Sequence, residues 1–152
     1  MSVLSWGKCL IETTPSVSGA PGESATWTAI DTPKDGTTQL NPTAGQETTA
    51  NEEGGEVVDA RNGKTTYTLE FDLFVKKGGT RPFTDNDGVI SGEHAFRVSP
   101  VEDPDCEGIQ IDRSTVRVEE SYNTADGKML HYVARCLKPA SGKTVKPYTK
   151  GS

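Results

Sequence analysis

The clearest pattern in the chain is an alternation of apolar and polar residues from Thr65 to Lys77. Its apolar positions are Tyr67, Leu69, Phe71, Leu73 and Val75. Successive side chains of a strand point to opposite faces of a sheet, so this period of two predicts a strand with one buried and one solvated face. Asn62-Gly63 separates it from the strand-like run Glu56–Ala60. Because Asn-Gly readily adopts the positive φ angles of a two-residue turn, we predict a hairpin here.

A second hairpin is predicted near the end of the chain. Ser114–Tyr122 alternates in polarity, Lys128–Lys138 is rich in apolar residues, and Asp126-Gly127 supplies a turn between them. Shorter strands are predicted at Ser5–Thr13, Thr26–Ile30, Glu93–Ser99 and Gly108–Asp112. Strands separated by turn residues, without a long helical period, indicate an all-β fold of the β-sandwich or barrel-like type. A mainly β fold with one short helix near Asn86–Ser91 is also compatible with the pattern.

Three segments have too few apolar residues to predict regular structure. They are Thr14–Ser24, which is rich in Pro, Gly and Ser, the long acidic loop Gly36–Gly55, and the basic C-terminal arm Lys138–Ser152. A structureless loop of about 20 residues is uncommon in a compact domain and is usually functional or disordered. Such segments bury too little apolar surface to order themselves. We therefore expect one domain over residues 1–152 whose loop and arm become ordered against other chains.

The composition indicates a thin core, and the charged residues are unevenly distributed along the chain. Only 32% of the 152 residues are hydrophobic, whereas soluble domains have about 45–50% when Gly is included. The net charge is −6, with nine acidic and two basic side chains in residues 1–60, and six basic and no acidic ones from Lys128 onward. Oppositely charged surfaces on identical subunits attract, so this polarity favours head-to-tail association. A solvated surface with uneven charge is the alternative.

The sequence shows no signal for a membrane or for secretion. No apolar run approaches the roughly 20 residues of a membrane span, and residues 1–12 lack the apolar centre of a secretory signal. Cys9, Cys106 and Cys136 are odd in number and widely spaced, which favours free thiols over a disulfide framework. We expect synthesis in a cytoplasm and no contact with a membrane.

No catalytic, cofactor-binding or metal-binding residue is assigned from the sequence. His94 and His131 lack the closely spaced Cys or His partners of a zinc site. Thr84–Gly88 resembles part of a calcium loop, but Phe83 and His94 would then occupy its first and twelfth ligand positions. No acid or base is paired with an orienting partner in a recognisable motif. We therefore expect a protein that is not an enzyme and that holds no cofactor or metal.

Several segments, none of them diagnostic alone, occur in a recognisable order along the chain. Thr38–Glu47 and Asn51–Asp59 lead into the strand that contains Tyr67, and they are followed by Arg81-Pro82-Phe83, Asp87–Glu93, Leu137–Ala140 and Val145–Tyr148. This order, which extends from about Trp6 to Tyr148, resembles the major tail tube proteins of long-tailed, siphovirus-like bacteriophages, particularly those of gut bacterial phages and prophages. The resemblance implies a β-sandwich or barrel-like subunit that forms stacked rings, typically hexameric, whose strands line a channel for the genome.

The resemblance also implies which parts of the chain make contacts. The loop at 36–55, the first few residues and the arm at 138–152 would contact the neighbouring ring. The partners would be further copies of the chain and the tail terminator, tape measure and tail-tip proteins, in the tail of a virion. DNA would pass without specific binding, since it carries about one negative charge per 1.7 Å and an acidic wall does not hold it.

Two other functions are compatible with the sequence. The inner tube of a contractile injection system shares the fold and the assembly logic, and would be accompanied by a sheath. A monomeric β-sandwich that binds carbohydrate or protein is the second alternative. Such a module would usually present clustered aromatic residues on a rigid face, and the two tryptophans, Trp6 and Trp27, both lie near the start of the chain.

Overall fold

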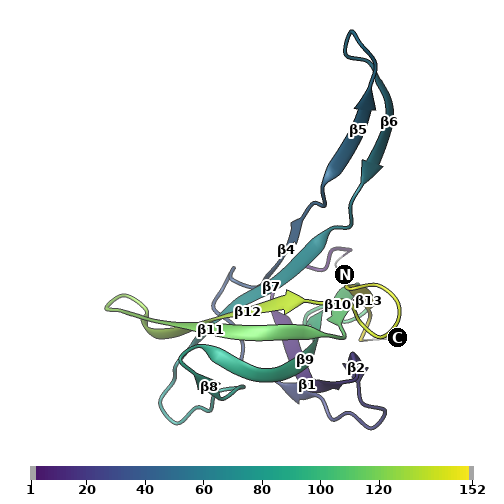
Figure 1. Ribbon diagram of the computed structural model, residues 1–152. Helices are drawn as coiled ribbons and strands as arrows, with labels where there is room; N and C mark the ends of the chain where they lie inside the picture. Colours follow the sequence, from purple (N-terminus) through teal and green to yellow (C-terminus); the bar gives the residue numbers. More distant parts are fainter. Residues whose placement is uncertain (1–2, 151–152) are drawn as a thin grey trace.

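The protein is described by a computed structural model over residues 3–150. These residues form strands and no helix, and most of the strands build one curled antiparallel sheet with the shape of a half-barrel (Figure 1). The strands are β1 Cys9–Val17, β2 Ala20–Pro21, β3 Thr28–Ala29, β4 Gln39–Thr43, β5 Glu47–Asn51, β6 Val57–Asn62, β7 Thr66–Phe74, β8 Asp85–Asn86, β9 Val89–Pro100, β10 Gly108–Ile111, β11 Ser114–Asn123, β12 Gly127–Cys136 and β13 Lys146–Tyr148. The all-β prediction is confirmed.

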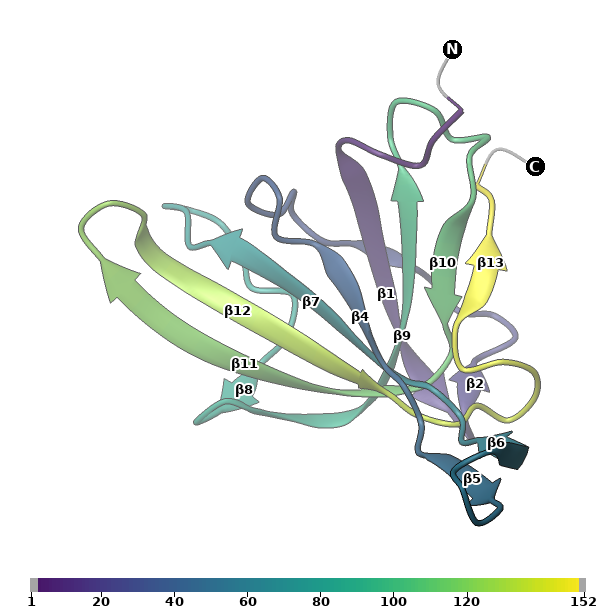
Figure 2. The ribbon, with the colours of Figure 1, turned by 90° about the horizontal axis from the view of Figure 1, so that it is seen from above.

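The sheet curls because β9 has different neighbours along its length. The order of the main path is β13-β10-β9-β11-β12-β7-β4, and β1 also pairs with β9. The first part of β9 pairs with β11 through Val89 and Glu93, whereas its second part, from His94 onward, pairs with β1. Gly92 lies at the change of neighbours with a φ of 79°, a conformation that L side chains rarely adopt. Figure 2 shows the two groups of strands diverging from β9.

The core lies inside the curl and is centred on aromatic rings. Phe71 stacks on Tyr132 with ring centroids 5.4 Å apart, and Phe96 meets Phe71 edge to face at 6.3 Å. Leu69, Phe71 and Leu73 of β7 are buried, as their alternation predicts. Burying one large apolar side chain contributes about 1.5–3 kcal/mol, so this cluster holds the two parts of the sheet together.

One of the two predicted hairpins is confirmed. β11 pairs with β12 in register from Ser114–Cys136 to Asn123–Gly127, around the predicted Asp126-Gly127 turn. The hairpin predicted around Asn62-Gly63 is wrong. β6 pairs with β5, and β7 pairs with β4 and β12, so the chain runs on from β6 into β7 without turning back.

The short helix expected near Asn86–Ser91 is also replaced by strands. β8 and β9 form a tight hairpin whose two turn residues, Asp87 and Gly88, have φ values of 51° and 87°. Asp85 Oδ2 accepts a hydrogen bond of 3.0 Å from the Gly88 backbone nitrogen. The Asp and Gly residues of this segment therefore form a turn, for which their tolerance of positive φ suits them.

All three segments expected to be irregular contain strands. The predicted loop Gly36–Gly55 contains β4 and β5, and Thr14–Ser24 contains the end of β1 and all of β2. The C-terminal arm Lys138–Ser152 contains β13, which pairs with β10. The expectation that the arm is irregular in a single copy is therefore wrong for β13. Residues 1–2 and 151–152, which belong to the two expected arms, lie outside the described residues.

Candidate assembly surfaces

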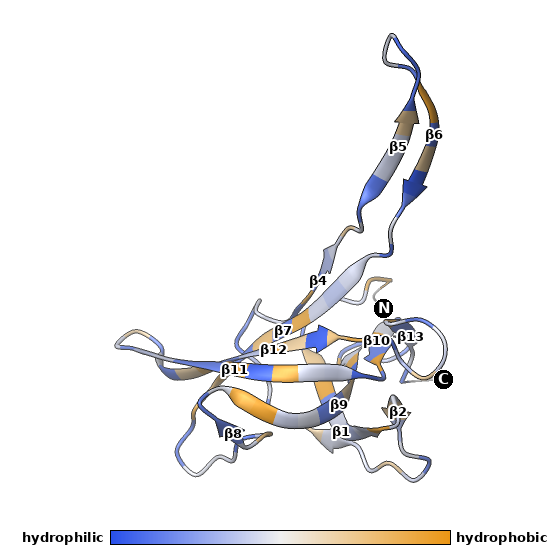
Figure 3. Cartoon of the chain, viewed as in Figure 1, coloured by the Kyte–Doolittle hydropathy of each residue, from blue (hydrophilic) through white to orange (hydrophobic). Residues whose placement is uncertain are grey.

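The most unusual feature of the fold is the β5–β6 hairpin, which projects away from the body (Figure 1). Its two strands form a sheet of their own, and every residue of both strands is exposed. Val57 and Val58 are 59% and 58% exposed, and they form an apolar spot on a mainly hydrophilic hairpin (Figure 3). A two-stranded hairpin without a packed face is at best marginally stable in water, so little within the described chain stabilises this element.

The hairpin closes at an acidic turn. Glu52 donates its backbone N–H to Glu56 O at 2.8 Å, and Gly55 donates its N–H to Glu52 O at 3.0 Å. Gly54 and Gly55 have φ values of 94° and 97°, so glycine is needed at both positions. Residues 47–59 carry five acidic side chains and no basic one: Glu47, Glu52, Glu53, Glu56 and Asp59. The far end of the hairpin is therefore strongly acidic.

Two glycines join the hairpin to the body. A Cβ atom added at Gly45 would fall within 3.0 Å of the backbone of Gly63 and Lys64. Gly63 donates its backbone N–H to Gln46 O at 2.8 Å. The two chain segments therefore pass each other more closely than side chains allow. This crossing explains why Asn62-Gly63 does not form a turn, since Gly63 is required for close approach and has no positive φ.

A second surface is the solvated face of β4, β7, β12 and β11. The strand register places Asn41, Thr68, Arg135 and Thr115 in one row across this face. The next rows contain Gln39, Glu70, Val133 and Arg117, and then Asp72, His131 and Glu119. Acidic and basic side chains therefore occur together on a face whose other side is the core.

His131 lies at the centre of a polar network on this face. Its Nδ1 contacts Asp72 Oδ1, and its Nε2 lies 3.2 Å from Glu70 Oε1. Asn41 donates a hydrogen bond to the same Glu70 carboxylate. Burial lowers the pKa of the imidazole, but hydrogen bonds and charge from Asp72 and Glu70 raise it, and the net shift is upward. The network thus favours a positively charged His131.

Beside this network is a hollow of about 390 Å³ with two arginines on its wall. Its lining residues are Thr68, Thr115, Val116, Arg117, Val133 and Arg135. Val133 points to the solvated side but is only 6% exposed, which fits arginine stems packing over an apolar neighbour. Arg117 lies 3.9 Å from Glu119. The hollow adds positive charge to a face that otherwise carries carboxylates.

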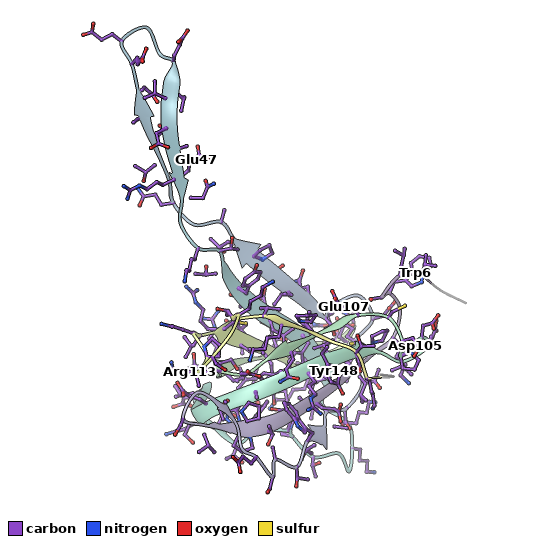
Figure 4. The ribbon with its side chains drawn as sticks, turned by 90° about the vertical axis from the view of Figure 1, so that its right-hand side faces the viewer. Trp6, Glu47, Asp105, Glu107, Arg113 and Tyr148 are labelled. Atoms are coloured by element: carbon purple, nitrogen blue, oxygen red, sulfur yellow. The ribbon has the colours of Figure 1, made fainter. Side chains whose placement is uncertain are left out.

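The C-terminal strand is held by its own body. β13 pairs with β10 from Gly108–Tyr148 to Gln110–Lys146. Arg97 lies between two aromatic rings, 3.9 Å from the Trp27 centroid and 4.8 Å from that of Tyr148. Lys146 forms an ion pair with the buried Asp112. These contacts fix β13 in place, and Figure 4 shows Tyr148 in the body, far from Glu47 on the hairpin.

The three cysteines differ in burial, and Cys9 and Cys106 are partly exposed. Cys136 is buried, and burial raises the pKa of its thiol to about 11, so it stays protonated at neutral pH. Cys9, Cys106 and Cys136 form no disulfide within residues 3–150. Within residues 3–150, no three His, Cys, Asp or Glu side chains are grouped as a metal ion would require. The same residues include no helix that could cross a membrane.

Comparison of the sequence with protein-family models and with curated proteins found no match. The sequence predicts most of β6 as the strand-like run Glu56–Ala60, but not its partner β5, in which no apolar face alternates with a polar one. The signals that could have found it are the paired glycines, Gly45 and Gly63, and the Gly54-Gly55 turn.

Proposed function

We propose that this protein is a structural subunit of a phage tail tube, in which copies of the chain form stacked rings around a channel for the genome. The observation that carries the proposal is the β5–β6 hairpin, which is exposed along its whole length and projects from a well-packed body. An isolated hairpin of this kind is marginally stable. The low stability of the hairpin is offset if, in an assembly, each copy binds the hairpin of another copy.

The solvated face of β4, β7, β12 and β11 is the part of the subunit that we assign to the channel. The resemblance to tail tube proteins implies that strands line the channel, and the other face of these strands is occupied by the core. Glu70, Asp72 and Glu119 offset the charges of Arg117 and Arg135 on this face. A wall with little net positive charge forms few lasting contacts with phosphates.

The C-terminal arm, unlike the hairpin, is not assigned to the contact between rings. In a single copy, β13 already pairs with β10 and Tyr148 contacts Arg97. The arm therefore has a partner within its own chain, and the hairpin is the element that lacks one. We assign the contact between rings to the hairpin.

Electron microscopy of the purified protein tests the proposal. At high concentration, or with a tail-tip initiator complex, the protein should form rings or tubes with a central channel. A protein that stays monomeric under both conditions contradicts the proposal and favours a monomeric binding module. Tubes that acquire an outer sheath from a co-expressed sheath protein would instead indicate the inner tube of a contractile injection system.

Hydrogen exchange on free and polymerised protein tests the role of the hairpin. We expect β5 and β6 to gain protection on assembly, because in the free protein they pair only with each other and such a hairpin opens readily. β7, which is buried in the sheet, should be protected in both states. Unchanged exchange in β5 and β6 after polymerisation would contradict the assignment of the ring contact to the hairpin.

A further inference from the structure

The connection between β7 and β8 is a basic loop, which we define as residues 75–82. It contains Lys76, Lys77 and Arg81 and no acidic residue. Arg81 pairs with Asp85 and Glu120 at 3.8 and 3.1 Å. Lys76 and Lys77 are exposed, and neither forms an ion pair within residues 3–150. The loop therefore presents two exposed ammonium groups that no ion pair within these residues neutralises.

The basic loop and the acidic hairpin lie at opposite ends of one strand. The chain enters β7 from β6 at Thr66 and leaves it into the basic loop after Phe74. Nine residues at about 3.3 Å each make this strand roughly 30 Å long. In Figure 1 the hairpin is at the upper right, and β8, which follows the basic loop, is at the lower left. One copy cannot bring its own hairpin to its own basic loop.

Resting on the proposed function, we infer that the acidic end of the β5–β6 hairpin of one copy binds the basic loop of the next copy. Glu52, Glu53 and Glu56 of one subunit would face Lys76 and Lys77 of another. Two unlike surfaces at opposite ends of a subunit form a heterologous contact, which continues as an open stack when its rotation does not close a ring. Complementary charge selects this orientation and opposes hairpin-to-hairpin contact.

The other basic segment of the chain lies at the wrong end for this contact. β12 is antiparallel to β7, and Arg135 near its end pairs with Thr68 near the start of β7. Lys138 and Lys143, which follow β12, therefore belong to the end of the sheet from which the hairpin projects. Subunits stacked along the direction of the hairpin would bring its acidic end to the basic loop of the neighbour.

Charge reversal tests the contact. Lys76→Glu/Lys77→Glu makes both ends of the subunit acidic, and Glu52→Lys/Glu53→Lys/Glu56→Lys makes both ends basic. Each variant alone should raise the protein concentration needed for assembly by about tenfold or more, because like charges replace opposite ones. An equimolar mixture should recover assembly with the two variants alternating, since each hairpin then meets a loop of opposite charge. Sedimentation and electron microscopy measure polymer yield.

Lys138→Glu/Lys143→Glu is the matched control, because it reverses two exposed lysines at the other end of the sheet. We expect this variant to assemble as the wild type does. The contact is overturned if Lys76→Glu/Lys77→Glu assembles normally, if the mixture does not recover assembly, or if the control variant alone is blocked. Urea unfolding of each variant checks that the body remains folded.

Failure of the contact can be distinguished from failure of the proposed function. If the wild type forms no rings or tubes, the two charge-reversed proteins are mixed and examined by analytical ultracentrifugation at low salt, where exposed charges are least screened. A complex in the mixture, absent for either protein alone, would support the contact while the tube proposal fails. Absence of that complex would overturn the contact as well.

Discussion

The body and the hairpin of this protein are stabilised in different ways. In the body, Phe71, Phe96 and Tyr132 are almost completely buried and their rings contact one another. In the hairpin, β5 and β6 expose every residue and pair only with each other. The body therefore has a core that can support folding of a single copy, whereas the two strands of the hairpin bury no side chain.

This difference suggests a division of roles between the two regions. Net stability of a domain is a small difference between large terms, and apolar burial is the largest favourable one. Residues that bury nothing in the free protein contribute little to its stability. Their sequence is then free to serve a contact, as the acidic residues of the hairpin would. Mutations in the two regions should accordingly affect different measurements.

The largest effect is expected in the aromatic core. Phe71→Ala removes a ring that is 0% exposed and stacks on Tyr132. Truncating a buried Phe to Ala costs about 3–5 kcal/mol, from lost burial and the cavity left behind. Urea unfolding of the free protein measures the loss. Val58→Ala on the hairpin is the matched comparison and should change stability by less than about 0.5 kcal/mol. Equal losses would contradict the division of roles.

A smaller and more local effect is expected at the crossing that joins the two regions. Gly45→Ala places a Cβ against the backbone of Gly63, and such overpacking costs about 1–3 kcal/mol. We expect faster hydrogen exchange in β5 and β6, with little change in β7. Gly22→Ala is the control, because an added Cβ there meets no atom within 4 Å. If Gly45→Ala leaves exchange in the hairpin unchanged, the close approach does not hold the hairpin.

The same comparison explains what could be predicted from the sequence. The β11–β12 hairpin was predicted because its strand pattern and its Asp126-Gly127 turn are both local signals. β5 was missed because Glu47–Asn51 has no apolar face, and strand patterns are recognised by burial. Asn62-Gly63 led to the wrong prediction of a hairpin, because the same residues suit both a turn and a close approach of two strands. Only knowledge that Gly45 lies opposite distinguishes the two.

The solvated face was predictable only in part. The alternation in β7 places Glu70 and Asp72 on the solvated side, as the structure has them. That His131 lies between their carboxylates depends on β12 pairing with β7 in one register. Sequence patterns identify strands but do not specify which distant strands pair. The network around His131 therefore could not be derived from the sequence.

An intermediate effect is expected where the C-terminal strand is attached to the body. Tyr148→Ala removes one of the two rings that flank Arg97, and cation–π contacts are worth about 0.5–2 kcal/mol. We expect a loss of about 1 kcal/mol in urea unfolding and faster hydrogen exchange in β13. Lys150→Ala, two residues further along, should leave both unchanged. If Tyr148→Ala has no effect on β13, the ring does not hold the strand.

The smallest effect concerns His131 and depends on pH. The pKa of His131 is raised in the folded protein by Asp72 and Glu70, so its protonated form stabilises the fold. This contribution is fully present below the unfolded pKa of about 6.5 and is lost as pH rises through the higher folded pKa. Because the side chain is about one-third exposed, water screens the interaction and we expect less than about 1 kcal/mol. Glu119 is the nearest charged residue on β11 by register.

Urea unfolding of wild type and His131→Gln should differ most at pH 5.5 and converge by pH 8.5. A difference that stays constant over this range would mean that packing rather than charge explains the contribution of His131.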